Sequence, residues 1–393
     1  MSVAVTDQRW LYRIGHGLDG RLLAVAAALV MIGLIAVASA SISIADRNLG
    51  DPFYYLRRQG AFLGLALIGG FIIYQIPLRL WARSGLALML LAFFLLLLVL
   101  VPGLGKEVNG AMRWIAVGPF HLQVSEPARI LLLLYVAGYM VRRQQELSER
   151  FAGFFKPVLV VGLACFLLLL QPDFGAAIVL LVTVLTLLFL GGVRIRDFSF
   201  LGGAGAMVMA GLAFSSPYRV ERMTTFLNPW ADPFNSGFQL TQSLIAIGRG
   251  EWWGVGLGGS VQKLFYLPEA HTDFIFAVLF EEVGLIGILV LMGLFAYLVW
   301  RCFRIGSLAW QQGQLFGAYV AWGIAIWLAV QTGINMGVNM GLLPTKGLTL
   351  PLISYGGSSL LVTVGALALV LRVSRELTPV SNRRRQSRGE VRA

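Results

Sequence analysis

The sequence predicts an all-α polytopic membrane protein with about ten transmembrane helices. Two observations support this prediction. The 393 residues are 58% hydrophobic and only 13% charged, whereas soluble domains contain roughly 25% charged residues. The apolar residues also fall into long runs, and a helix needs a run of about 20 to cross a bilayer. Counting soluble domains by length therefore does not apply to this chain.

The apolar runs number ten, separated by polar, Gly-rich or Pro-rich stretches. They lie near residues 22–44, 58–76, 84–102, 127–141, 156–171, 174–192, 199–215, 274–300, 314–337 and 349–371. The first run is long enough to remain as an anchor, so we expect no cleaved signal peptide. Gln171-Pro172-Asp173 leaves room only for a tight turn between two spans. An even number of spans places both termini on one side of the membrane.

The distribution of positive charge predicts which side that is. Of the 31 Lys and Arg residues, 20 fall on the side of the termini, seven on the other side and four in the long loop 216–272. Because long loops count little in the positive-inside rule, both termini are expected in the cytoplasm. The predicted regions are a cytoplasmic N-terminal segment 1–21, a transmembrane catalytic domain 22–372 and a basic cytoplasmic tail 373–393.

The long loop 216–272 lies between the seventh and eighth spans and is expected to be extracytoplasmic. Leu240, Leu244 and Ile247 share one helical face, which predicts an interfacial helix lying on the bilayer. The following stretch 248–259, GRGEWWGVGLGG, combines six glycines with two tryptophans. Such a stretch is typical of a mobile flap at the membrane surface or of an ordinary re-entrant loop, and both alternatives stay open.

Composition excludes several functional classes. Cys165 and Cys302 lie far apart in or beside apolar runs, outside any CxxC or Cys/His pattern, so we predict neither a disulfide nor a zinc site. The net charge of +12 comes partly from five arginines in the tail, which we interpret as a membrane anchor with no nucleic-acid partner. The sequence contains no Walker A loop, GxSxG or HExxH motif.

Asp273 is the leading candidate for a catalytic residue. It closes the long polar loop and opens an apolar helix, in Pro268-Glu269-Ala270-His271-Thr272-Asp273. An ionisable side chain at the mouth of a membrane span is costly and indicates function. An N-cap aspartate is the alternative, but Thr272 can cap by itself. Glu282, nine residues on, falls on roughly the opposite helix face and is interpreted as a structural carboxylate.

Further polar residues collect on the predicted outer side. Arg129 stands inside the fourth apolar run, so it needs an anion, and both Asp273 and Glu126 are candidates. Arg58, Arg113, Arg129 and Lys346 could together bind pyrophosphate. The alternative is that they are unrelated loop cations near the lipid headgroups. The motif 354–359 is a weak candidate for an anion nest. The candidate binding or positioning residues are Arg58, Arg113, Glu126, Arg129, Asp173, His271, Lys346 and Ser358.

The chain resembles the SEDS family (shape, elongation, division and sporulation) of peptidoglycan glycosyltransferases over roughly 22–372. The resemblance is strongest in RWI at 113–115, QPDFG at 171–175, PEAHTDFIFA at 268–277 and PTKGLTLPLISYGGSS at 344–359. NPWADPF at 228–234 and GRGEWWGVGLGGSVQK, which starts at 248, are more similar to the division branch than to the elongation branch. One motif departs, because the family's QPSE followed two residues later by Lys is QVSEPAR at 123–129.

The resemblance implies an enzyme that polymerises lipid II into glycan strands during septal cell-wall synthesis. It implies an inverting reaction that forms a β-1,4 bond and releases undecaprenyl pyrophosphate. Asp273 matches the family's essential aspartate and would act as the base for the acceptor hydroxyl. The cations would compensate the leaving pyrophosphate. No resident metal site is evident, although a divalent cation (Mg or Mn) is an option.

The resemblance also implies partners and a location. The partners are a class B penicillin-binding protein, an FtsI-like transpeptidase, and the activating FtsQ–FtsL–FtsB complex. The location is the bacterial inner membrane at the division septum. Two alternatives from other classes remain, a lipid II flippase and a non-catalytic division scaffold. A flippase needs a polar path that reaches both faces of the membrane, whereas the candidate charges collect on one side.

Overall fold

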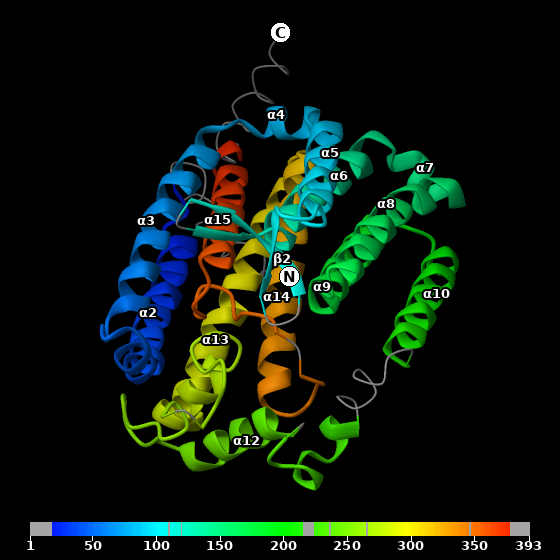
Figure 1. Cartoon of the computed structure of the whole chain (residues 1–393). Coiled ribbons are helices and arrows are strands. Elements are labelled where there is room, and N and C mark those ends of the chain that lie inside the picture. The colour runs from blue at the N-terminus through cyan, green and yellow to red at the C-terminus, as the bar shows by residue number, and fades with distance from the viewer. Residues whose placement is uncertain are drawn as a thin grey trace, which may run out of the picture.

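The computed structural model describes residues 18–108, 111–118, 120–214, 224–235, 237–264, 266–345 and 347–377. This part of the chain is a bundle of long helices (Figure 1). The first half contains α2 (Gly20–Leu49), α3 (Tyr54–Gln75), α4 (Leu78–Arg83), α5 (Gly85–Leu98), α6 (Ser125–Arg142), α7 (Gln144–Glu149), α8 (Phe151–Leu170) and α9 (Phe174–Leu190). The second half contains α10 (Ile195–Phe214), the short η1 (Pro229–Ala231), α12 (Phe238–Gly250), α13 (Ile275–Gln311), α14 (Leu315–Asn339) and α15 (Gly357–Glu376).

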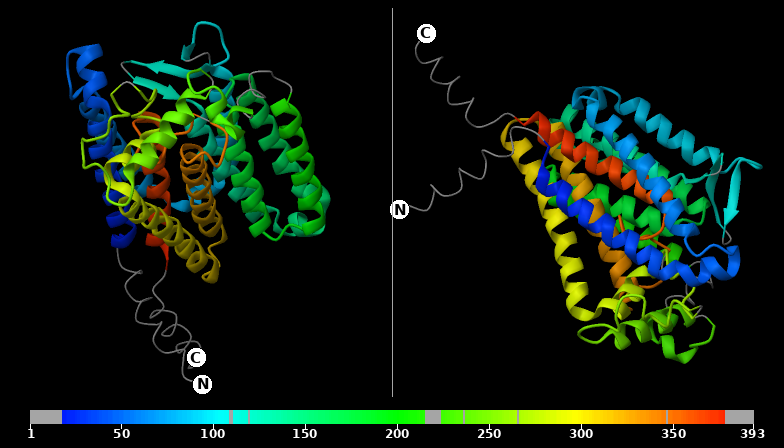
Figure 2. Two further views of the ribbon diagram at one scale, coloured as in Figure 1. Left: turned by 90° about the horizontal axis from the view of Figure 1, so that it is seen from below. Right: turned by 90° about the vertical axis from the view of Figure 1, so that its left-hand side faces the viewer.

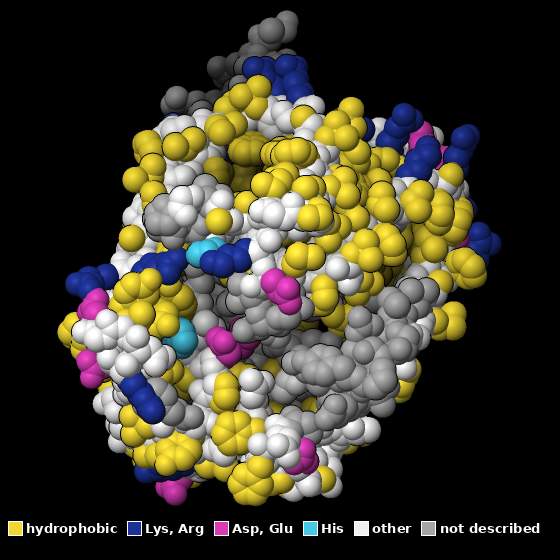
Figure 3. All heavy atoms as spheres, in the orientation of Figure 1, with side chains coloured by type: hydrophobic (Ala, Val, Ile, Leu, Met, Phe, Trp, Pro, Cys, Tyr) yellow, Lys and Arg dark blue, Asp and Glu magenta, His cyan; other side chains and the backbone are white. Residues whose placement is uncertain are grey.

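The prediction of a polytopic membrane protein is confirmed. Six described helices are long and apolar enough to cross a membrane, namely α2, α3, α8, α13, α14 and α15, and the apolar α5 and α9 are shorter. Each of the ten predicted apolar runs overlaps one helix. Eight of these helices are the ones just named, and the other two are α6 and α10. Large hydrophobic side chains are exposed over much of the bundle surface (Figure 3), where contact with lipid would make their exposure favourable.

The prediction of an all-α fold needs one correction. The stretch 103–126, between the third and fourth predicted spans, contains a three-stranded antiparallel sheet, made of β1 (Gly105–Val108), β2 (Ala111–Val117) and β3 (Phe120–Gln123). Trp114 pairs with Lys106 on one side and with Gln123 on the other. Gly118, with φ +59°, supplies the turn between β2 and β3. A search for long apolar runs misses such a sheet, because its strands are short and half-polar.

The last two predicted spans also have different limits in the structure. The run 349–371 is helical only from Gly357, because Pro351 lacks a backbone donor and Leu352 has a left-handed φ of +65°. The described residues of 341–356 therefore form a loop at the end of the bundle that carries the candidate site. The run 274–300 extends as α13 to Gln311, with a break at Gly284 (φ +67°, ψ −174°).

The two ends of the bundle differ in their elements. The start of α2 and the end of α15 lie together, while the sheet and α12 lie at the opposite end (Figure 2). Asp19 and Arg301 are both buried at the first end, with Arg301 Nη2 2.8 Å from Asp19 Oδ2, and this pair ties α2 to α13. Exposed basic side chains, Arg79 and Arg83 among them, gather near α4 and α7 at that same end (Figure 3).

The packing is centred on α14, which is buried along most of its length and contacts α6, α9, α13 and α15. Cys165 and Cys302 are both buried as free thiols. The predicted interfacial helix corresponds to α12, which buries Leu240 and Ala246 on one side. Its orientation on a bilayer stays a prediction.

Candidate active site

Asp273 lies in the turn-rich segment that precedes α13, and its side chain is half-buried. Two amides of α14 hold its backbone, because Asn335 Nδ2 and Asn339 Nδ2 each donate to the Asp273 carbonyl oxygen at 3.0 Å. Asn335 Nδ2 also donates to the Leu348 carbonyl at 2.6 Å. One helix therefore fixes both the aspartate-bearing segment and the loop 341–356 that faces it.

The loop 341–356 approaches the Asp273 carboxylate closely. A Cβ atom added to Gly347 would lie 3.0 Å from Asp273 Oδ2, a distance tighter than ordinary van der Waals contact. Lys346, the cation predicted here, precedes Gly347 but lies outside the described residues. Any side chain at position 347 would push against the carboxylate, so glycine keeps the space beside Asp273 open.

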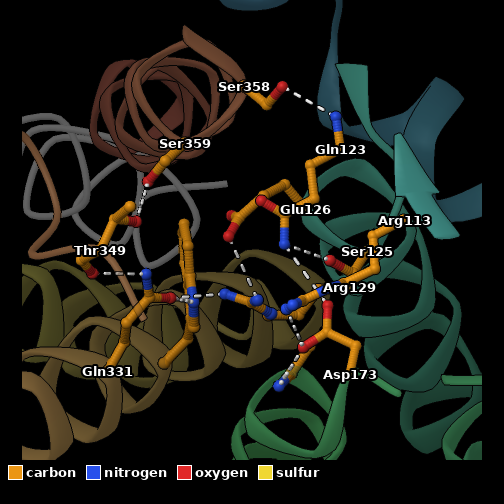
Figure 4. Close-up of polar contacts among 12 residues, drawn as sticks. Arg113, Gln123, Ser125, Glu126, Arg129, Asp173, Gln331, Thr349, Ser358 and Ser359 are labelled. Carbon is orange, nitrogen blue, oxygen red and sulfur yellow. Dashed lines mark hydrogen bonds and ion pairs between the residues drawn. The ribbon is translucent and has the colours of Figure 1, made fainter. Parts of the chain in front are cut away.

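Arg129 is the centre of a buried network (Figure 4). Its Nη2 lies 3.4 Å from Glu126 Oε1, its Nη1 donates to Gln331 Oε1 at 2.5 Å, and its guanidinium lies 5.4 Å from the Trp327 ring centroid. Of the two anions proposed for Arg129, the structure pairs it with Glu126. Among the described residues no contact joins Arg129 to Asp273.

Gln331 extends this network across the bundle. Its Oε1 also accepts from Trp327 Nε1 at 2.7 Å, and its Nε2 donates to the Thr349 carbonyl at 3.0 Å. Gln331, Asn335 and Asn339 are spaced by four residues, so they form one polar stripe on α14 that faces both loops. Sequence reasoning missed this stripe, although three amides at a helical period within an apolar run were a visible signal.

Arg113 and Asp173 form a second polar pair beside the first (Figure 4). Arg113 Nη1, on β2, lies 3.7 Å from Asp173 Oδ1, and the Arg113 side chain is 23% exposed. Asp173 is buried and caps α9 by accepting from the Ala176 N–H at 3.2 Å. Gln123 Nε2 donates to Ser125 Oγ at 3.1 Å and to Asp173 Oδ2 at 3.4 Å. These contacts position Arg113 at the rim of the network with its side chain partly exposed.

Ser358 joins the sheet to α15. Its Oγ accepts from the Gln123 N–H at 2.9 Å and donates to the His121 carbonyl at 3.2 Å. The next hydroxyl, Ser359 Oγ, accepts from Thr349 Oγ1 at 3.0 Å. The Ser358 hydroxyl is therefore occupied by backbone groups, and its position fits a structural role at the edge of the site better than direct anion binding.

An aromatic cluster lies next to Asp273. The His271 ring centroid is 4.6 Å from that of Tyr55 and 5.6 Å from that of Tyr355, and the His271 carbonyl accepts from the Tyr355 N–H at 2.9 Å. Burial lowers the pKa of His271 and raises the pKa of Tyr355 to about 12. Both side chains are therefore neutral near pH 7. Arg58 donates to Tyr54 Oη at 3.0 Å on the same side.

The structure thus arranges the predicted residues in three groups. The first, Glu126 and Arg129, is connected through the α14 stripe to the second, Asp273 and His271. Arg113, Asp173 and Ser358 border the first group through Gln123, and Arg58 lies with the aromatic cluster. No group of three or more His, Cys, Asp or Glu side chains that could hold a metal ion occurs in the described part, so the residues do not fit an all-protein metal cage.

Comparisons with known proteins identify the family. A family model described as a cell cycle protein, covering FtsW, RodA and SpoVE, matches residues 20–379. The chain is 57% identical over 369 residues to a probable peptidoglycan glycosyltransferase FtsW of Thioalkalivibrio sulfidiphilus, covering 94% of this chain and 92% of the relative. It is 55% identical over 377 residues to that of Halorhodospira halophila, covering 96% and 95%.

Solved structures show the same fold. One is a chain from the structure reported as "Structural coordination of polymerization and crosslinking by a peptidoglycan synthase complex". It has a TM-score of 0.76 and is 32% identical in sequence, and the match covers 92% of this chain and 98% of that chain. The rod shape determining protein RodA of Thermus thermophilus gives a TM-score of 0.67 at 31% identity, covering 92% and 98%. The chain therefore belongs to the SEDS family of cell cycle proteins that comprises FtsW, RodA and SpoVE, and within it to the FtsW type.

Proposed function

We propose that this protein is a peptidoglycan glycosyltransferase that polymerises lipid II into glycan strands during septal cell-wall synthesis. The names of its relatives support the enzyme class. The observation that carries the proposal is the position of Asp273. Two side-chain amides of α14 bind its backbone carbonyl, at the end of the bundle that also carries the sheet. A carboxylate carried on a backbone held in this way can accept a proton in the transition state.

The proposed reaction is an inverting displacement. The 4-hydroxyl of the lipid II GlcNAc attacks the anomeric carbon of the MurNAc at the end of the growing chain. A β-1,4 bond forms as the bond between that carbon and the pyrophosphate oxygen breaks, and the electron pair leaves with undecaprenyl pyrophosphate. Asp273 takes the proton of the attacking hydroxyl, which raises the nucleophilicity of that oxygen.

The leaving pyrophosphate requires positive charge where its negative charge develops. Arg129 contributes little directly, because its guanidinium is buried and bound to Glu126 and Gln331. Arg113 suits the role better, since it is 23% exposed and held only at 3.7 Å by Asp173. Arg58 and Lys346 are further candidates by sequence. Glu126 and Asp173 then act as positioning residues that hold the two arginines.

The same proposal places the protein in the inner membrane at the septum, with ten spans and both termini in the cytoplasm. The exposed arginines near α4 and α7 support a cytoplasmic assignment for that end. The partner is a class B penicillin-binding protein, an FtsI-like transpeptidase, and this is supported by the structural similarity to a peptidoglycan synthase complex. The FtsQ–FtsL–FtsB complex is the proposed activator of the pair.

The alternatives fit the observations less well. A flippase needs polar groups along a path through the membrane, whereas the α14 stripe, Arg129 and Arg113 gather near the loops at one end. At the other end the buried charges Asp19 and Arg301 neutralise one another at 2.8 Å. A non-catalytic scaffold would not need an ionisable side chain at the mouth of a helix.

The test is glycan polymerisation from lipid II by the purified protein with its transpeptidase. Because a positioned general base contributes about 10²–10⁴-fold, Asp273→Asn is expected to lower polymer formation by at least about 100-fold. Asp46→Asn is the matched control, since Asp46 is an exposed carboxylate on α2. Polymerisation by Asp273→Asn at the rate of the control would refute the assignment. Lipid II movement without polymer formation by the native protein would favour the flippase.

A further inference from the structure

A buried cluster of charges outside the catalytic groups joins three segments of the chain. Lys263 Nζ donates to Glu282 Oε1 at 2.8 Å and to Ser39 Oγ at 2.9 Å, and Ser39 Oγ donates to the same carboxylate oxygen at 2.6 Å. The Lys263 and Glu282 side chains are only 8% and 1% exposed. The cluster ties α2, α13 and the segment 251–274 together at one point.

The neighbouring carboxylate holds the same segment by its backbone. Glu281, which is fully buried, accepts from Ser260 Oγ at 2.5 Å, from the Val261 N–H at 3.1 Å and from the Gln262 N–H at 3.3 Å. Arg249 Nη1 lies 3.3 Å from the same side chain. Two consecutive carboxylates of α13 therefore bind the stretch that immediately precedes the Asp273 loop.

The break in α13 explains why the segment attaches here. At Gly284 the helix leaves backbone groups without intrahelical partners, and such groups must be satisfied inside a membrane protein. The Glu281 and Glu282 carbonyls accept from the N–H groups of residues 255 and 256, while the N–H groups of residues 285 and 286 donate to the carbonyls of residues 251 and 252. The Gly/Trp-rich stretch, for which a flap and a re-entrant loop were both open, is thus paired with α13.

The segment between Lys263 and α13 carries Asp273 and is anchored at both ends. Lys263 holds its beginning, and the two α14 amides hold its end at the Asp273 carbonyl. Between the anchors, Leu267, Ala270 and Phe274 pack in one buried cluster with Ala40 of α2, the residue after Ser39. A displacement at Lys263 would therefore be transmitted to Asp273 through the buried residues of a short segment.

The geometry points to Lys263 and Glu282 as a positioning pair that sets the place of the Asp273 carboxylate by locking its segment onto the break in α13. This inference rests on the proposed function of Asp273 and adds two residues to the reaction that do not touch the reacting atoms. Removing one member leaves the other as an uncompensated buried charge, which favours opening of the segment. The pair therefore controls turnover while leaving the substrate-binding cations in place.

The experiment measures the position of the segment and the reaction separately. Ala270, which is fully buried, is replaced by cysteine in a background with Cys165→Ala and Cys302→Ala, and the rate of maleimide labelling reports opening of the segment. Lys263→Met is expected to raise that rate about tenfold or more, because a local anchor is lost. In the same variant without the reporter, kcat for polymerisation falls by about tenfold or more with KM little changed.

The controls exchange the charges of the Lys263–Glu282 pair or remove a charge elsewhere. Exchanging the pair, with Lys263→Glu and Glu282→Lys together, is expected to recover a large part of both the labelling protection and kcat. Lys156→Met removes a surface cation whose side chain is 60% exposed and lies 3.7 Å from Glu146, and it is expected to change neither. Should Lys263→Met not fold, Ser39→Ala keeps the ion pair, removes one hydrogen-bond partner and gives a smaller shift in the same direction.

Two results would overturn the inference: labelling of Lys263→Met at the wild-type rate, or faster labelling with unchanged kcat. Failure of the proposed function itself has a different signature. In that case the unmodified protein forms no polymer with its partner, while the labelling experiment still reports whether the pair anchors the segment.

Discussion

Replacement of Arg129 by leucine tests the buried network most directly. Arg129 is 1% exposed, and Glu126, its partner at 3.4 Å, is equally buried. In the described part of the chain, Glu126 Oε2 already lacks a hydrogen-bond partner. Without the arginine, the carboxylate becomes an isolated buried charge. Breaking a buried pair in this way costs about 3–5 kcal/mol, and the lost contact with the Trp327 ring adds up to about 2 kcal/mol.

The interaction energy between Glu126 and Arg129 is measured with a double-mutant cycle. Glu126→Leu together with Arg129→Leu removes both charges, so the double variant is expected to be more stable than Arg129→Leu alone. Arg129→Lys keeps the charge but cannot present the planar fork of donors that reaches Glu126 and Gln331 together, and a loss of about 1–2 kcal/mol is expected.

The assay is unfolding of the purified protein in detergent, followed for the wild type and four variants: Arg129→Leu, Glu126→Leu, the double variant and Arg129→Lys. A stability loss of less than about 1 kcal/mol in Arg129→Leu would refute the reasoning, since it would mean that Glu126 is not held as a buried anion. Losses in the two single variants that simply add in the double variant would refute the coupling between the two residues.

Three further predictions concern the surroundings of the site. Asn335→Ala removes an amide from the Asp273 carbonyl, and because a small misplacement of a catalytic group costs up to about 100-fold, a fall in kcat of about 10–100-fold without loss of folding is expected in the polymerisation assay. Since burial lowers the pKa of His271, its contribution to stability is present above the unfolded-state value of about 6.5 and is lost as pH falls through the lowered folded-state pKa; His271→Phe should flatten the decline in thermal stability below about pH 6.5. Gly284→Ala places a Cβ 2.3 Å from a backbone nitrogen at φ +67°, and should cost at least about 2 kcal/mol, whereas Gly293→Ala in the same helix meets open space and should be neutral or slightly stabilising in the same unfolding assay.

Local sequence was sufficient for the features that depend on composition and period. Long apolar runs predict membrane helices because a bilayer imposes one length on every span. The motifs around Asp273 and at 344–359 predicted the family, and the family model and relatives confirm it. The limits of elements were less well predicted at 349–356, where a loop replaces the start of an expected run, and at 103–126, where a sheet stands in a stretch expected to connect two spans.

Only the tertiary structure decided how the polar groups are paired. Arg129 could meet either Glu126 or Asp273 by sequence, and the fold of α6 against α14 gives it Glu126 and Gln331. Asn335 reaches Asp273 across 62 residues of sequence, and Lys263 reaches Ser39 across 224. Hydrophobic periodicity orients each helix face towards lipid or core. The pairing of a buried polar group depends on which neighbouring helix supplies its partner, and that is a property of the whole packed bundle.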